Sequence, residues 1–74
     1  MKRLYDLSRN DTATIKKIHS NEALKLRLIS LGITKGAQVT VLECSSTKQT
    51  MQIEIGTMRI ALRDNEAMEI EVDA

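Results

Sequence analysis

The chain contains no phenylalanine, no tryptophan and no proline, and its one aromatic residue is Tyr5. Domains that bind proline-rich peptides line their grooves with aromatic side chains, and single-stranded nucleic acids are held by stacking bases on such rings. One tyrosine in 74 residues supplies neither kind of surface. The composition therefore disfavours both functions.

Cysteine and long apolar runs are also scarce. Cys44 is the one cysteine, so the chain forms no internal disulfide, which agrees with a reducing compartment. No apolar run of the sequence approaches the roughly 18 residues that a membrane-spanning helix requires. The first eleven residues, MKRLYDLSRND, lack the apolar centre of a signal peptide. We therefore expect one cytoplasmic domain that covers residues 1–74.

Residues that could ligate a metal or act as nucleophiles are few. A zinc site uses about four ligands, mostly Cys or His in paired spacings, whereas this chain has one of each, Cys44 and His19. The simplest interpretation makes Cys44 a partly buried apolar side chain and His19 a solvated loop residue. The glycines form neither a P-loop nor a dinucleotide fingerprint. We predict no enzyme, no cofactor and no metal site, and keep metal carriage by Cys44, His19 and carboxylates as a third hypothesis.

The charges are unevenly distributed along the chain. Residues 1–36 carry eight Lys or Arg and three Asp or Glu, whereas residues 37–74 carry three and seven, for a net charge of +1. Either the two halves face each other and cancel, which small folds favour, or the basic half offers a surface to an acidic partner. A small nucleic-acid-binding barrel that uses the basic half is the alternative function. The low net charge argues against it, and steep salt dependence would reveal it.

Five short segments have the composition or alternation of strands. The segment TATIKKI, residues 12–18, favours a strand, and the three-residue spacing of Ile15 and Ile18 predicts a bulge near Lys16 and Lys17. Further strands are expected at 37–44 and 67–72, with a polar loop at 44–50 and a turn or single 3₁₀ turn at 63–66. The residues of these two strands expected to face inward are Val39, Val41, Met68, Ile70 and Val72.

The remaining two strands, 51–55 and 58–62, are predicted to form a hairpin around Gly56-Thr57. Glycine in the first position of a two-residue loop is typical of a type II′ turn. This turn sets Glu54 opposite Arg59 and brings apolar residues face to face. The methionines other than Met1 fall at strand positions, which suggests that they fill the core. The expected apolar pairs are Ile55 with Met58, Ile53 with Ile60 and Met51 with Leu62.

The segment HSNEALKLRLISLG, residues 19–32, has the pattern of a helix. Ser20 or Asn21 can cap its start, Glu22 suits its first turn, and Gly32 can take the left-handed conformation that ends it. Gly36 would then permit the tight turn into the next strand. Leu24, Leu28 and Leu31 form one apolar stripe at helical spacing.

Two further apolar residues of this helix, Leu26 and Ile29, fall nearly opposite that stripe. A helix on a small barrel buries one stripe, so a second one needs another explanation. Either the two residues pack under the lead-in, against Leu4, Tyr5 or Leu7, or they form a docking face for another protein. The residues predicted for the docking face are Lys25, Leu26, Arg27 and Ile29, with the charged two as its rim.

Two blocks of the sequence together resemble the FeoA family of small cytosolic proteins that assist bacterial ferrous iron uptake. The first block is RLISLGITKGAQVTVL and the second is IEIGTMRIALR, followed by AMEIEV as a last strand. The resemblance extends from Ala13 to Val72. The residues that carry it are Arg27, Leu28, Leu31, Gly32, Gly36, Val39 and Val41 in the first block, and Gly56, Ile60, Ala61, Leu62 and Arg63 in the second.

The resemblance implies a fold and a partner. The fold is mainly β with one helix, a small SH3-like barrel of about five strands with the helix inserted after the first strand. The partner is FeoB, the membrane protein that moves Fe²⁺ and carries a cytosolic G-protein domain. We therefore predict a non-enzymatic interaction module that regulates or assembles FeoB at its cytosolic side. It would meet the membrane only through FeoB, would bind no nucleic acid and could self-associate weakly. Gly32, Gly36 and Gly56 would be structural.

Overall fold

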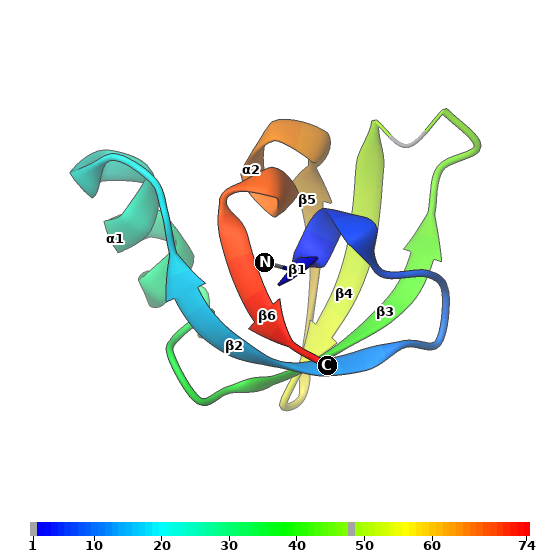
Figure 1. Cartoon of the computed structure of the whole chain (residues 1–74), viewed down its shortest axis with the longest axis horizontal. Helices are drawn as coiled ribbons and strands as arrows, with labels where there is room; N and C mark the ends of the chain where they lie inside the picture. The colour runs from blue at the N-terminus through cyan, green and yellow to red at the C-terminus, as the bar shows by residue number, and fades with distance from the viewer. Residues whose placement is uncertain (1, 48) are drawn as a thin grey trace.

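A strongly curled antiparallel sheet forms the body of the protein (Figure 1). The computed structural model describes residues 2–47 and 49–74, so Lys48 of the predicted 44–50 loop lies outside the described residues. In this part of the chain the sheet has six strands in the spatial order β1-β6-β2-β3-β4-β5. The strands are β1 Lys2–Arg3, β2 Thr12–Ile18, β3 Gln38–Cys44, β4 Thr50–Ile55, β5 Met58–Arg63 and β6 Ile70–Asp73. The helices are the 3₁₀ turn η1 Leu4–Asp6, α1 Glu22–Ser30 and α2 Asp64–Met68.

The expectation of a mainly β chain with one longer helix is confirmed, with two differences in the elements. The lead-in adds the two-residue strand β1, which pairs with β6, so α1 follows the second strand. Residues 63–68 do not hold a turn followed by a strand, because Asp64–Met68 form α2. Asp64 and Glu66 lie in the first turn of α2, where carboxylates suit the helix dipole.

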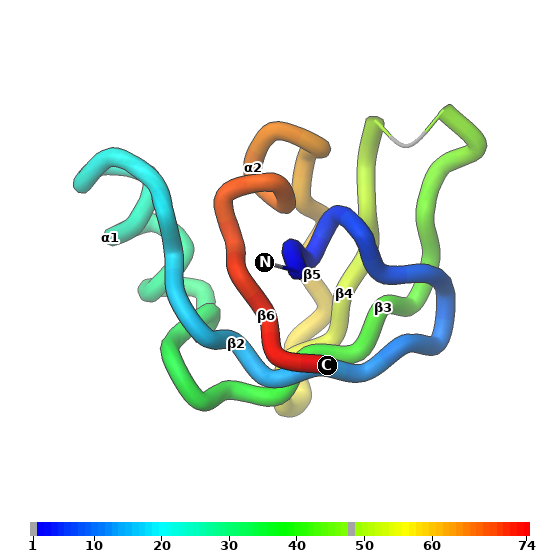
Figure 2. Tube along the Cα trace, viewed as in Figure 1, coloured from blue at the N-terminus to red at the C-terminus, as the bar shows by residue number. Residues whose placement is uncertain are grey.

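The lead-in closes one end of the curled sheet. Figure 2 shows it in blue beside β6 and α2, which agrees with the residue contacts that η1 makes with both. Leu4 and Leu7 are buried in the core and Tyr5 packs against it. The lead-in is therefore a structural part of the core, at the far side of the sheet from α1 (Figure 1).

The strand details follow the alternation of the sequence closely. The pairing of β2 with β6 shifts between Ile15 and Lys17, which confirms the predicted bulge. Val39 and Val41 of β3 are buried, as are Ile70 and Val72 of β6.

The hairpin of β4 and β5 has the predicted register in every pair. Glu54 stands opposite Arg59, and the Oε2 atom of Glu54 lies 3.7 Å from Nε of Arg59. Gly56 has a φ of +60°, and Thr57 is not among the described residues with positive φ, as a type II′ turn requires.

Two of the three methionines expected in the core are on the surface. Met51 is buried, but Met58 is 47% exposed and Met68 is 40% exposed. Met58 begins β5 at the tip of the hairpin, beyond the reach of the core. Met68 ends α2, so the strand that was expected to turn it inward starts two residues later, at Ile70.

Candidate functional site

Helix α1 begins and ends with local hydrogen bonds that the sequence signals well. The Asn21 side chain accepts a hydrogen bond from the Leu24 amide at 2.9 Å, which caps the first turn. At the other end, the Ile33 amide donates to the Leu28 carbonyl and the Gly32 amide to the Ile29 carbonyl, each at 3.0 Å. This is the Schellman arrangement, which needs a left-handed residue after the cap. Gly32 supplies it with a φ of +92°.

The helix lies at the side of the sheet and has one fully buried side chain. Leu28 is inaccessible to solvent, whereas Leu24 and Leu31 of the same stripe are only partly covered. Ile33, just after the helix, is also fully buried and helps to fix the corner. The other two glycines lie in turns, Gly36 with a φ of +89° before β3 and Gly56 in the hairpin.

A charged pair attaches α1 to α2. Arg27 donates from Nη1 to Oε2 of Glu66 at 2.5 Å, and the Arg63 amide donates to the other oxygen of Glu66 at 2.9 Å. The Glu66 side chain is 7% exposed, whereas the Arg27 side chain is 59% exposed. Both carboxylate oxygens of a buried acid are thereby satisfied. Glu66 was not singled out from the sequence, although an acidic residue three positions after a helix cap is a recognisable signal.

Leu26 and Ile29 of α1 are exposed. Leu26 is 58% and Ile29 is 40% accessible to solvent. The interpretation that they pack under the lead-in is wrong, because Leu4 and Leu7 lie in the core instead. Two large aliphatic side chains on one short helix are thus left to water.

The four residues predicted for a docking face do not share one side of α1. Successive residues advance by about 100° around a helix, so Lys25 and Ile29 are about 40° apart while Arg27 is about 160° from Ile29. The structure accordingly brings Lys25 and Ile29 together at one hollow, and Arg27 turns toward Glu66. Leu26 lies between these directions and is the most exposed of the large apolar residues.

The hollow beside Ile29 runs between β2 and α1 and has a volume of about 440 Å³. We call it the lysine groove. It was not predicted, because its residues come from three separate segments of the chain. The residues that define it are Lys16, Lys17, Ile18, Lys25, Ile29, Thr34 and Lys35.

The acidic and basic halves of the chain meet at a few points. Arg27 pairs with Glu66, and Lys16 Nζ lies 3.6 Å from Oε2 of Glu71. His19 is an exposed loop residue, as expected from the sequence, and its Nε2 atom also lies 2.6 Å from the other oxygen of Glu71. The halves therefore cancel in part, as the first interpretation predicted.

The hydrogen bond with His19 lowers the pKa of the Glu71 carboxyl below its ordinary value of 4.5. Partial desolvation opposes this change, and the charge of Lys16 supports it. The pair joins the end of β2 to β6. It links the two strands, and among the described residues no third His, Cys, Asp or Glu joins the pair as a metal site would need.

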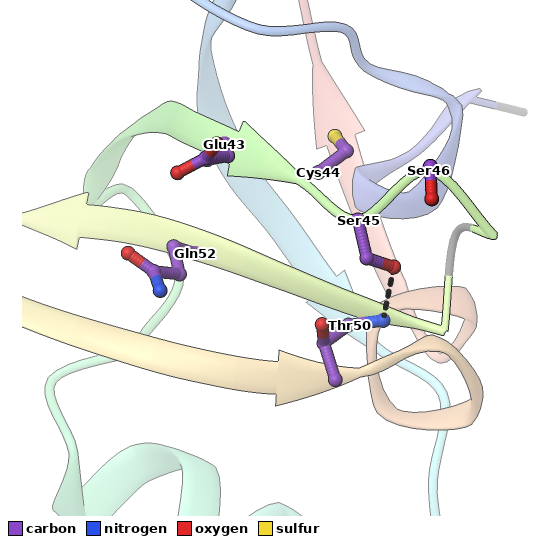
Figure 3. A pocket seen from close by; sticks show the side chains of 6 residues that line it. All are labelled: Glu43, Cys44, Ser45, Ser46, Thr50 and Gln52. Carbon is purple, nitrogen blue, oxygen red and sulfur yellow. Dashed lines mark hydrogen bonds between the residues drawn. The ribbon is translucent and has the colours of Figure 1, made fainter.

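A second hollow lies between the ends of β3 and β4, and Figure 3 shows its side chains. The hydroxyl oxygen of Ser45 accepts hydrogen bonds from the amides of Gln49 and Thr50, at 2.9 and 3.2 Å, and so shapes the loop. In Figure 3 the sulfur of Cys44 points away from the hydroxyl groups. Cys44 is partly covered and packs against the core, as predicted.

Within residues 2–47 and 49–74, no three His, Cys, Asp or Glu side chains lie together as a metal site would need. None of the helices in the described part of the chain is long and apolar enough to cross a membrane.

Comparison with known protein families gives one match. The model of the FeoA domain matches residues 2–74. A Fe(2+) transport protein A of Helicobacter pylori strain J99 is 47% identical over 47 residues, which are 64% of this chain and 60% of that protein. The matched part is thus less than two thirds of that relative's length. The corresponding protein of Campylobacter jejuni is 31% identical over 70 residues, or 95% of each chain.

A further relative joins two functions in one polypeptide. It is the Fe(2+) transport protein A/Fe(2+) transporter FeoB fusion protein of Porphyromonas gingivalis. The two sequences are 27% identical over 71 residues, which are 96% of this chain and 8% of the fusion protein.

Solved structures agree with the fold. FeoA of Chlorobium tepidum superposes with a TM-score of 0.89 at 28% identity, over 96% of this chain and 68% of that one. FeoA of Stenotrophomonas maltophilia, complexed with zinc and described as a procaryotic SH3 domain protein, has a TM-score of 0.86 at 28% identity. It covers 99% of this chain and 91% of its own. The expected SH3-like fold is confirmed.

Proposed function

The chain belongs to the FeoA family, and from that premise we propose that it is a non-enzymatic accessory protein of ferrous iron transport that binds FeoB. The contact would regulate or assemble the transporter at its cytosolic side, so this protein would act in the cytoplasm. The single observation that carries the proposal is the fusion protein of Porphyromonas gingivalis, in which a similar domain shares one chain with FeoB. A covalent link holds two partners at high effective concentration, which favours a functional contact between them.

The surface that we assign to this contact is the exposed side of α1. Leu26 and Ile29 present aliphatic surface to water, with Lys25 beside them. Burying such side chains against a partner is favourable by about 25 cal/mol per Å² of apolar area. Arg27, placed in the predicted rim, has a different task in this proposal: its pair with Glu66 holds α1 in position.

The nucleic-acid alternative has less support. The chain has one aromatic residue, Tyr5, and that residue packs against the core. Stacking on aromatic side chains is how small barrels hold single strands.

Substitution of Ile29 tests the proposal. Ile29→Asp places a charge on the exposed side of α1, and we expect the affinity for the cytosolic domain of the same organism's FeoB to fall about tenfold, since a charge in an apolar contact must be desolvated. Titration calorimetry measures the affinity, and circular dichroism verifies that the variant is folded. If Ile29→Asp unfolds, Leu26→Asp, at a position 58% exposed, provides the same test.

Met68→Asp is the matched control for this experiment. Met68 is 40% exposed, the same fraction as Ile29, but it lies on α2. The proposal requires Met68→Asp to bind like the unmodified protein. Equal losses in the two variants would show that α1 is not the specific contact surface.

A further inference from the structure

We propose that the lysine groove binds an acidic peptide segment that inserts one aliphatic side chain between Ile18 and Ile29. This inference rests on the proposed function, because it names the chemistry of the partner surface that meets α1. It goes further in placing the centre of the contact between β2 and α1, and in assigning it a sequence preference.

The lining of the lysine groove is strongly basic. Four lysines line it and no carboxylate does. Lys17, Lys25 and Lys35 make no ion pair within the described chain, and Lys16 shares Glu71 with His19. Four ammonium groups around one hollow produce a positive potential that attracts and orients an acidic segment.

The lining of the groove also includes two isoleucines. Ile18 is 8% exposed and belongs to the core, whereas Ile29 is 40% exposed, and both contribute aliphatic surface to the lining of the hollow. A phosphate group or a nucleic acid backbone gains nothing from that surface, but a leucine or isoleucine flanked by carboxylates uses both features. The volume of about 440 Å³ falls within the range of about 300–1,000 Å³ typical of clefts that bind small ligands.

Two elements that are attached to the rest of the fold form the walls of the groove. One wall is β2, which is fixed in the sheet, and the other is α1, which is attached through Leu28 and through the Arg27–Glu66 pair. Arg27 lies about 160° around α1 from Ile29 and Leu28 about 100° from it, so neither attachment occupies the side that carries Ile29. The helix is therefore held without covering the groove, which stays open to a partner.

The test uses an isotope-labelled sample of the protein and a synthetic peptide in which a leucine is flanked by two glutamates on each side. We expect amide shifts at Lys17, Ile18, Ile29 and Lys35 at low salt. Replacing the leucine of the peptide by serine should reduce binding at least fivefold. A peptide with lysines in place of the glutamates should not bind.

Charge reversal within the groove and outside it provides the matched pair of variants. Exposed ion pairs are worth up to about 1 kcal/mol, so Lys35→Glu should weaken peptide binding about fivefold. Lys2→Glu makes the same charge change on the exposed strand β1, away from the groove, and should leave binding within about twofold.

The proposal is overturned if the peptide moves no groove signal, or if the serine peptide binds as well as the leucine peptide. It is equally overturned if vesicles containing phosphatidylserine, a short oligonucleotide or inorganic phosphate shift the same signals at lower concentration. Titration with the FeoB cytosolic domain separates this inference from the proposed function. If Lys35→Glu and Lys2→Glu bind that domain equally well, the proposed function stands and the lysine groove is rejected as the contact site. If the protein binds the peptide but does not bind the FeoB domain, the lysine groove stands as a peptide site and the proposed function is rejected.

Discussion

Gly32 is the residue whose backbone conformation the fold depends on most directly. Its φ of +92° lies in the region that side chains with a Cβ avoid, whereas the added Cβ itself would meet Ile55 only at an ordinary 3.8 Å. Gly32→Ala should therefore lower the free energy of unfolding by about 1–2 kcal/mol through backbone strain rather than through a clash. Urea denaturation measures this change, with Lys25→Ala on the exposed surface of α1 as the control. An unchanged midpoint for Gly32→Ala would show that the corner tolerates another conformation.

Glu71 gives the stability a dependence on acid pH. Its pKa is lower in the folded protein than the ordinary value of 4.5, chiefly because of the hydrogen bond with His19. Because the pKa of Glu71 is lower in the folded state than in the unfolded state, the ionised carboxylate stabilises the fold at pH values above the unfolded-state pKa. This contribution is lost as the pH falls through the folded-state pKa. Glu71→Gln should therefore be less stable than the unmodified protein at pH 7, and the difference should shrink below about pH 4.5.

Unfolding curves between neutral and acid pH test this prediction. Glu43→Gln is the control, because Glu43 is exposed and makes no ion pair in the described chain. A stability difference between Glu71→Gln and the unmodified protein that stays constant with pH would contradict the assignment.

At the scale of elements, the attachment of α1 depends on the pair between Arg27 and Glu66. Arg27→Met keeps an aliphatic stem but leaves the buried carboxylate with the Arg63 amide alone. Because the Arg27 side chain is 59% exposed and its charge is screened, we expect a loss of about 1 kcal/mol. Amide hydrogen exchange should become faster in α1 and remain unchanged in β3 and β4. Uniform acceleration across all elements would mean that α1 does not open separately.

The sequence predicted those elements whose signals are local. The β4–β5 hairpin follows from alternation and from one glycine, and the ends of α1 follow from Asn21 and Gly32. The signal failed at residues 63–68, where the apolar spacing of Met68 and Ile70 imitates a strand although α2 occupies most of the segment. Strand β1 is too short to have any periodicity.

The candidate site was predictable only in part, because contacts between distant segments decide it. That Leu26 and Ile29 do not belong to the buried stripe could be read from helical spacing. Helical spacing does not reveal that Arg27 turns toward Glu66, which lies 39 positions later in the sequence. The lysine groove combines β2, α1 and the following turn, so only the folded chain brings its charges together.

At the scale of the whole molecule, the uneven charge of the sequence becomes an arrangement on the surface. The two halves neutralise each other where Arg27 meets Glu66 and where Lys16 meets Glu71. Three lysines that make no ion pair in the described chain, Lys17, Lys25 and Lys35, lie around the groove beside α1. The small barrel therefore presents aliphatic and basic surface on one side, next to the helix that projects from the sheet in Figure 1.

The most direct test of the central claim is a methyl NMR titration of the labelled protein with the cytosolic domain of its own organism's FeoB, with and without nucleotide. The account predicts shifts concentrated at the methyl groups of Leu26 and Ile29, with the buried Ile53 and Leu62 serving as internal references. Shifts confined to the β4–β5 hairpin or to the lead-in would contradict the assignment of α1. If no methyl signal shifts at a high concentration of the domain, with or without nucleotide, the proposed contact itself is contradicted.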